Sequence, residues 1–186
     1  QPPVAALTAT PTSGLAPLAV ALDAGGSSDP DADALTYEWA LDPDGVFNDG
    51  GGATKSRTFT TPGTVTVSVR VSDGRGGTST KSATITVGNR LPTVSLAASP
   101  TASTAPLNTT LTATGVDPDG TALTYRWDLD DDGAFDDGGT AATQAASFTA
   151  VGPHEVTVEV TDANGGKATA AQVVTVTNRP PAGIVY

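Results

Sequence analysis

The 186-residue chain contains no cysteine and no methionine, and its 9 Lys+Arg stand against 20 Asp+Glu, giving a formal net charge of −11. Without cysteine the chain has no disulfide, no thiol nucleophile and no thiolate ligand for zinc. The shortage of basic residues argues against a nucleic-acid partner or an anionic membrane surface, because both require a basic face. No apolar run approaches the roughly 20 residues of a membrane-spanning helix, so we predict no membrane insertion.

The sequence repeats with a period of about 89 residues. The tripeptide Tyr-Glu-Trp at 37–39 returns as Tyr-Arg-Trp at 125–127, and Phe59 and Asp73 return as Phe148 and Asp162. We therefore predict two tandem domains, at residues 1–88 and 89–178. Residues 179–186 restate the beginning of the second copy and are interpreted as the start of a further repeat or a linker.

Each copy has the pattern of strands and turns and no plausible helix. Valine alternates with polar residues over 65–72 and over 156–161, which is the period of a strand with one buried face. Asp-Gly-Arg-Gly-Gly at 73–77 and Asp-Ala-Asn-Gly-Gly at 162–166 are typical of hairpin turns. About seven short strands in 89 residues predict an all-β fold of two tandem immunoglobulin-like antiparallel β-sandwiches, with Trp39 and Trp127 in the two cores.

These motifs resemble those of PKD domains, the immunoglobulin-like modules named for polycystic kidney disease protein. The resemblance rests on the Tyr-x-Trp strand before an Asp/Gly turn, on Pro-Gly or Val-Gly before the valine-rich strand, and on the Asp that closes that strand. It implies a non-catalytic module outside the cytoplasm, in a secreted or surface protein. The turn after the tryptophan is longer and more acidic here than in most of the family, which usually reads Trp-Asp-Phe-Gly-Asp-Gly.

Five acids of the second copy form the strongest candidate metal site: Asp128, Asp130, Asp132, Asp136 and Asp137. Acids at alternate positions followed by a glycine suit Ca²⁺, which takes six to eight oxygen ligands. The spacing matches the first half of an EF-hand loop, but Gly139 stands where that loop has its bidentate Glu. The same residues also fit a solvated turn without a metal.

Two further sets of residues carry weaker predictions for calcium. The first copy keeps Asp42, Asp44, Asn48 and Asp49, but Ala40 replaces the first acid, so a plain turn is favoured there. The second set lies where strand ends of the second copy meet, and some PKD domains resemble it in using a linker Asn and loop acids for calcium. Its members are Asn89, Asp117, Asp119 and Asp162, and the corresponding first-copy acids are Asp29, Asp31, Asp33 and Asp73. Asp-Pro-Asp-Gly is also an ordinary turn sequence.

The sequence does not favour catalysis. His154 is the one histidine, and it stands where the first copy has Val65, so no Ser-His-Asp set is available in the first copy. Eight of the nine aromatic residues pair across the repeat at core positions, which leaves none for sugar stacking. We therefore predict a protein that is not an enzyme.

The leading interpretation is a non-catalytic extracellular spacer or adhesion-type module of a larger secreted or surface protein, with calcium as the expected cofactor. Its expected partners are other repeats or domains of the same polypeptide, and as a fragment it is expected to be a monomer. The alternative is an accessory module that holds a polysaccharide or a protein for an attached hydrolase or lyase. An exposed aromatic or polar stripe on one sheet would favour that alternative.

Overall fold

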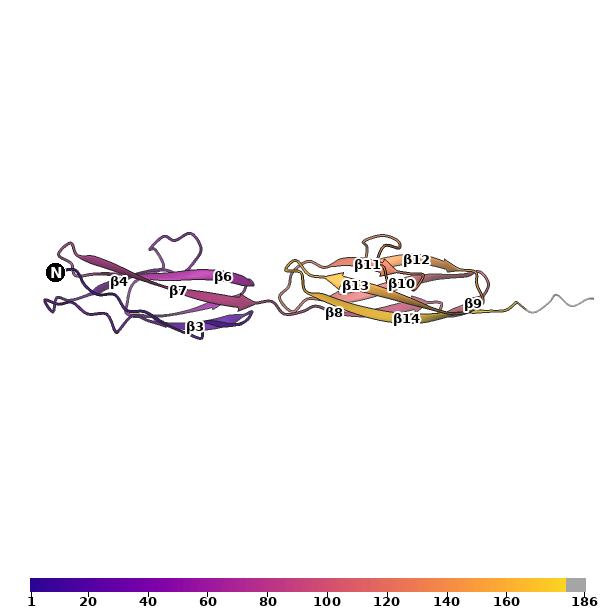
Figure 1. The fold of residues 1–186 in the computed structure, drawn as a ribbon, viewed down its shortest axis with the longest axis horizontal. Coiled ribbons are helices and arrows are strands. Elements are labelled where there is room, and N and C mark those ends of the chain that lie inside the picture. Colours follow the sequence, from indigo (N-terminus) through magenta and orange to yellow (C-terminus); the bar gives the residue numbers. More distant parts are fainter. Residues whose placement is uncertain (180–186) are drawn as a thin grey trace, which may run out of the picture. The chain divides into compact units, whose positions relative to one another are not determined.

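The computed structural model describes residues 1–179, which divide into two compact units, the first Gln1–Asn89 and the second from Arg90 onward. Within the described residues all regular structure is β and no helix is present (Figure 1). No helix of this part of the chain is therefore long and apolar enough to cross a membrane. The predicted fold class, two tandem immunoglobulin-like sandwiches, is confirmed. The predicted further repeat falls, apart from Arg179, outside the described residues.

The first unit packs two sheets face to face. One sheet has the order β1-β3-β5 and the other the order β2-β7-β6-β4. All neighbours are antiparallel except β2, which runs parallel to β7. The strands are β1 Thr8–Thr10, β2 Ser13–Leu15, β3 Leu18–Asp23, β4 Thr36–Ala40, β5 Thr54–Phe59, β6 Gly63–Ser72 and β7 Thr78–Gly88.

The second unit repeats this arrangement, with sheets in the orders β12-β10-β8 and β11-β13-β14-β9. Here β9 is the strand that pairs in parallel, with β14. The strands are β8 Thr93–Ser99, β9 Ala102–Thr104, β10 Leu107–Val116, β11 Thr124–Asp128, β12 Thr143–Phe148, β13 Gly152–Thr161 and β14 Lys167–Thr177.

Each unit has its own core, built around one tryptophan. Trp39 and Trp127 are both 0% exposed, and the valines of β6 and β13 that face inward are buried with them. The indole N–H still needs an acceptor once it leaves water. Trp39 Nε1 donates to the carbonyl of Gly52 at 2.8 Å, and Trp127 Nε1 donates to that of Ala141 at 3.1 Å. The predicted burial of both tryptophans is confirmed, and each indole also fastens the loop that follows its strand.

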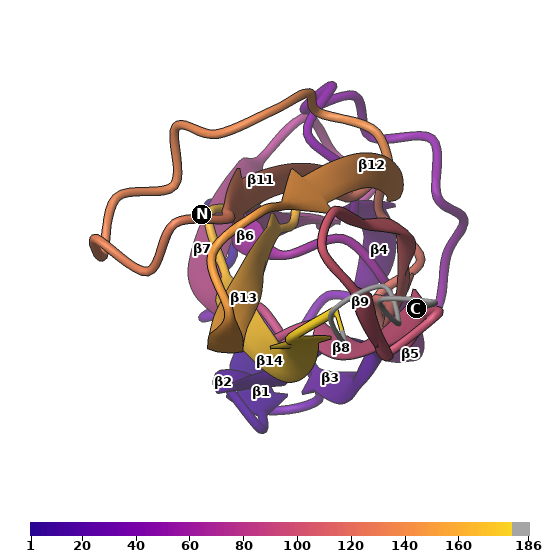
Figure 2. The ribbon, with the colours of Figure 1, turned by 90° about the vertical axis from the view of Figure 1, so that its right-hand side faces the viewer.

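That loop is the longest connection in each unit. In the second unit it joins β11 to β12 and stands out from its sandwich, as the orange segment of Figure 2 shows. Besides the indole bond, the amide of Asp137 donates to the carbonyl of Trp127 at 3.0 Å and holds the loop against β11. The equivalent bond in the first unit joins Asp49 to Trp39, also at 3.0 Å. These paired bonds place the acids of the two loops at corresponding positions.

Candidate functional site

Three of the five predicted acids in the β11–β12 loop lie together. Asp128, Asp130 and Asp137 each offer a carboxylate oxygen, and these oxygens all lie within 4.8 Å of one another. Asp132 and Asp136 are outside this group and are exposed. The group is formed by the last residue of β11, the residue two positions later and the residue held against Trp127.

Backbone N–H groups of the same loop fix two of these carboxylates. Asp128 is 4% exposed, and its two oxygens accept from the amides of Asp131 at 2.8 Å and Gly133 at 3.1 Å. Gly133 adopts a φ of 86°, a left-handed conformation that glycine takes without strain. Asp137 Oδ2 accepts from the amide of Leu129 at 2.7 Å. The loop therefore holds its carboxylates in place with neutral donors rather than with basic side chains.

The closeness of the carboxylates changes the pKa of the third one, Asp130. Partial desolvation within the loop raises the pKa of the exposed Asp130, and repulsion from Asp132, Asp137 and Asp128 raises that pKa further. Proximity to like charges makes ionisation of this group less favourable, and a divalent cation between the three carboxylates would reverse that effect. The three donors are all carboxylate oxygens, which are ligands that Ca²⁺ prefers.

The corresponding loop of the first unit is organised differently. Ala40 stands in place of Asp128, and the described residues show no such metal-type group at Asp42, Asp44, Asn48 and Asp49. Instead Asp49 Oδ1 lies 3.5 Å from Nη1 of Arg57, a residue of β5. The carboxylates of Asp42 and Asp44 accept hydrogen bonds from backbone amides of their own turn. A side-chain hydrogen bond with Asp44 raises the pKa of Asp42, whereas the amide of Val46 lowers the pKa of Asp44.

A basic side chain also occupies the second predicted set. Arg90 Nε donates to Asp119 Oδ1 at 2.7 Å and the Arg90 amide donates to Asp119 Oδ2 at 2.7 Å, so both oxygens are bonded. The Asp119 carboxylate is 0% exposed. The hydroxyl and amide of Thr121 both donate to Asp117 Oδ2, and the hydroxyl contact is the main reason that the pKa of Asp117 is lowered.

The other two members of that set are Asp162 and Asn89. Asp162 is 5% exposed and its Oδ1 accepts from the amides of Asn164 and Gly166, both at 2.8 Å, which closes the β13–β14 hairpin. Asn89 is the last residue of the first compact unit, whereas the three acids are in the second. Asp117, Asp119 and Asp162 are thus tied into turns and an ion pair of their own unit.

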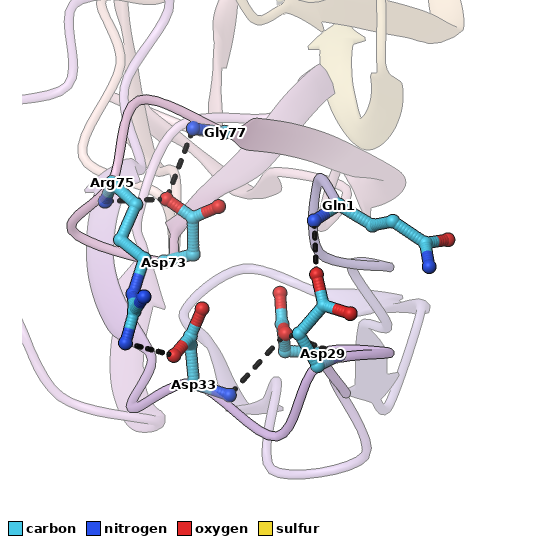
Figure 3. A network of polar contacts seen from close by, with 7 residues as sticks. Gln1, Asp29, Asp33, Asp73, Arg75 and Gly77 are labelled. Atoms are coloured by element: carbon cyan, nitrogen blue, oxygen red, sulfur yellow. Dashed lines mark hydrogen bonds and ion pairs between the residues drawn. The ribbon is translucent and has the colours of Figure 1, made fainter.

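The first unit carries the matching acids without an arginine at the position of Arg90, because Gln1 stands there. Figure 3 shows this network: Arg75 reaches Asp33 at 2.8 Å, and Asp73 Oδ1 accepts from the amides of Arg75 and Gly77. The α-amino group of Gln1 contacts Asp31. Asp29 Oδ1 accepts from the amides of Asp31 and Asp33. Asp29 Oδ2 is buried and accepts no hydrogen bond within the described residues.

The two arginines at the loop sites are the functional residues that sequence reasoning missed. Arg57 and Arg90 each sit at one copy of a repeated acidic site and are absent from the other copy, where Ala146 and Gln1 stand. A comparison of basic residues between the two copies would have found them. The comparison of acids alone, on which the predictions rested, does not show which sites already hold a cation.

The Arg90–Asp119 pair is expected to stabilise the second unit. Arg90→Met should lower the free energy of unfolding of that unit by roughly 1–2 kcal/mol, because the buried Asp119 carboxylate loses charged donors. Urea unfolding at neutral pH would measure the loss. Arg126→Met, a charge removal at an exposed position of β11, is the matched control and should change stability by less than about 0.5 kcal/mol. Equal effects of the two substitutions would contradict a specific role for the pair.

Comparisons with known proteins agree on the family. Models described as PKD domain match residues 1–87 and residues 93–175. Among solved structures the chain is similar to the PKD1 domain of Vibrio anguillarum Epp, with 22% identity, 49% of this chain and 99% of that chain covered, and a TM-score of 0.39. It is similar to the PKD domain of an M14-like peptidase from Thermoplasmatales archaeon SCGC AB-540-F20, with 21% identity, 49% and 100% covered, and a TM-score of 0.38.

Proposed function

Since the chain belongs to the PKD domain family, of which it carries two members in tandem, we propose that it is a non-catalytic spacer and adhesion-type module of a larger secreted or surface protein. The observation that carries this proposal is where the aromatic and acidic residues of the two domains lie. Both tryptophans are buried in the cores, and the acids close loops at strand ends. Such an arrangement stiffens a sandwich rather than forming a catalytic cleft.

Calcium is proposed as the cofactor of the β11–β12 loop. Asp128, Asp130 and Asp137 would hold the ion, which would supply positive charge to three carboxylates that otherwise repel one another. The equivalent loop of the first domain has less need of a metal, because Arg57 already provides a cation beside Asp49. By the same reasoning, Arg90 makes a metal at Asp119 unnecessary. A second calcium position is favoured in the first domain, because Asp29 Oδ2 is buried and accepts no hydrogen bond within the described residues. The acids at this position are Asp29, Asp31, Asp33 and Asp73.

A depletion assay tests the spacer role against that of a substrate-binding accessory module. The tandem would be mixed with insoluble cellulose, chitin and fibrillar collagen in calcium-containing buffer, and the protein left in solution would be measured after centrifugation. A spacer is expected to stay in solution with all three. Saturable depletion by any one of them would overturn the spacer proposal in favour of the accessory module.

A further inference from the structure

The second domain has a pocket of about 420 Å³ beside the edge strand β12. Its lining includes Asp130 and Asp137 from the acidic loop, Ala146 and Phe148 from β12, and His154 from β13. The first domain has a pocket of about 360 Å³ at the corresponding place, with Asp42, Arg57 and Phe59 in its wall. Among the positions that line both pockets, Ala146 stands where the first domain has Arg57, and His154 stands where it has Val65.

In the first domain this arginine side chain makes two contacts. Its Nη1 lies 3.5 Å from Asp49 Oδ1, and its Cζ lies 5.9 Å from the centre of the Phe59 ring. A guanidinium suits this place because it pairs with a carboxylate through its edge and with an aromatic ring through its face. The first domain thus shows which chemical group the shared framework accepts.

The second domain keeps that framework and lacks the arginine. Asp137 corresponds to Asp49, and its Oδ2 accepts the same backbone bond, from Leu129 at 2.7 Å, that Asp49 Oδ2 accepts from Leu41 at 2.6 Å. Phe148 corresponds to Phe59 and is packed against His154, with the ring centres 4.9 Å apart. The His154 ring is itself fixed, because Nε2 lies 2.7 Å from the Ala150 carbonyl oxygen. The pocket is preformed around the position of the missing guanidinium.

The strand that borders the pocket, β12, lies at the edge of its sheet. Within the described residues β12 pairs on one side only, with β10. Charged side chains protect edge strands from pairing with other chains. The matching edge strand β5 carries Lys55 and Arg57, whereas β12 has Gln144 and Ala146 at those positions and no charge along its length. An added strand would bond through the backbone and place one side chain at the pocket.

We infer that the second domain binds an extended polypeptide segment along β12, with an arginine side chain of that segment in the pocket lined by Asp130, Asp137 and Phe148. The net charge of −11 selects a basic partner over a second copy of this chain, since two copies would bring their acidic loops together. This inference goes beyond the spacer role and concerns the domain without calcium, because a calcium ion on Asp130 and Asp137 would compete with the arginine for the same two carboxylates. Asp128 belongs to the proposed metal group but does not line the pocket.

Peptide titration followed by NMR tests the inference. The probe is a blocked pentapeptide of threonine and valine with a central arginine, added to the ¹⁵N-labelled tandem in EDTA. We expect saturable shifts of the β12 amides, and at least about tenfold weaker binding of the same peptide with uncharged citrulline in place of arginine. Equal binding of the two peptides, or shifts spread over both domains without saturation, would overturn it.

Paired variants make the result specific. Ala146→Arg should abolish binding by filling the pocket from within, and Lys55→Gln combined with Arg57→Ala should create a second site, in the first domain. Asp136→Asn, which removes an exposed acid outside the pocket, should leave binding unchanged. The titration in EDTA contains no free calcium, which separates failure of this inference from failure of the calcium proposal. Undiminished binding to Ala146→Arg would contradict the inference, as would equally tight binding of agmatine alone, which has no backbone to pair with β12.

Discussion

Trp127→Ala is expected to lower the free energy of unfolding of the second domain by about 3–5 kcal/mol, the usual cost of deleting a core aromatic side chain. Trp127 is 0% exposed, and its indole also bonds the Ala141 carbonyl, so the substitution leaves both a cavity and an unsatisfied acceptor. For a domain of this size the melting temperature should fall by roughly 15–30 °C. Calorimetry would resolve this as a shift of one of two transitions.

The repeat supplies a matched control for that experiment. In Trp127→Ala the remaining tryptophan, Trp39, reports by fluorescence on the first domain alone, and its transition should stay close to that of the wild type. Trp39→Ala should produce the mirror-image result, because each tryptophan packs in a separate core cluster. A loss below about 1 kcal/mol in either variant would contradict the central role given to these side chains.

Calcium is expected to raise the stability of the second domain. Binding to the folded state only stabilises it by RT ln(1 + [L]/Kd), about 2.7 kcal/mol when calcium is a hundredfold above Kd. Extracellular modules bind calcium at about 10⁻⁴–10⁻³ M, so roughly 10 mM calcium should stabilise the domain by about 1.4–2.7 kcal/mol and raise its melting temperature by about 5–20 °C over EDTA. Calorimetry of the wild type in the two buffers makes the measurement.

The stabilisation of the second domain by calcium should depend on pH, and the raised pKa of Asp130 sets the direction of that dependence. The pKa of Asp130 is raised in the folded state, so without calcium its contribution to stability is present below the ordinary Asp pKa and is lost as the pH rises through the folded value. Calcium binds the ionised carboxylate, so its stabilising effect should grow over the same interval and be complete at neutral pH.

Asp130→Ala should remove most of the calcium effect, whereas Asp44→Ala should not. Superimposable traces with calcium and with EDTA would refute the metal proposal for this loop.

The sequence was sufficient to predict the fold because the relevant signals are local and occur twice. Valine alternation over 65–72 and 156–161 specifies strands with one buried face, and the Asp/Gly turns at 73–77 and 162–166 specify the hairpins between β6 and β7 and between β13 and β14. A period of two residues and a turn composition need no knowledge of distant parts of the chain. The repeat then predicts that both halves share one architecture.

The candidate sites depended on contacts that spacing does not contain. Adjacent acids of the β11–β12 loop look alike in sequence, yet only Asp128, Asp130 and Asp137 converge, because the bond from the Asp137 amide to the Trp127 carbonyl folds the loop back on β11. Arg57 lies eight residues from Asp49 and Arg90 lies 29 residues from Asp119. Whether a carboxylate faces other carboxylates or an arginine is decided by strand pairing, which brings residues far apart in the chain within hydrogen-bonding distance. Composition thus determined how acidic the loops are, and tertiary structure determined which of those charges are already neutralised.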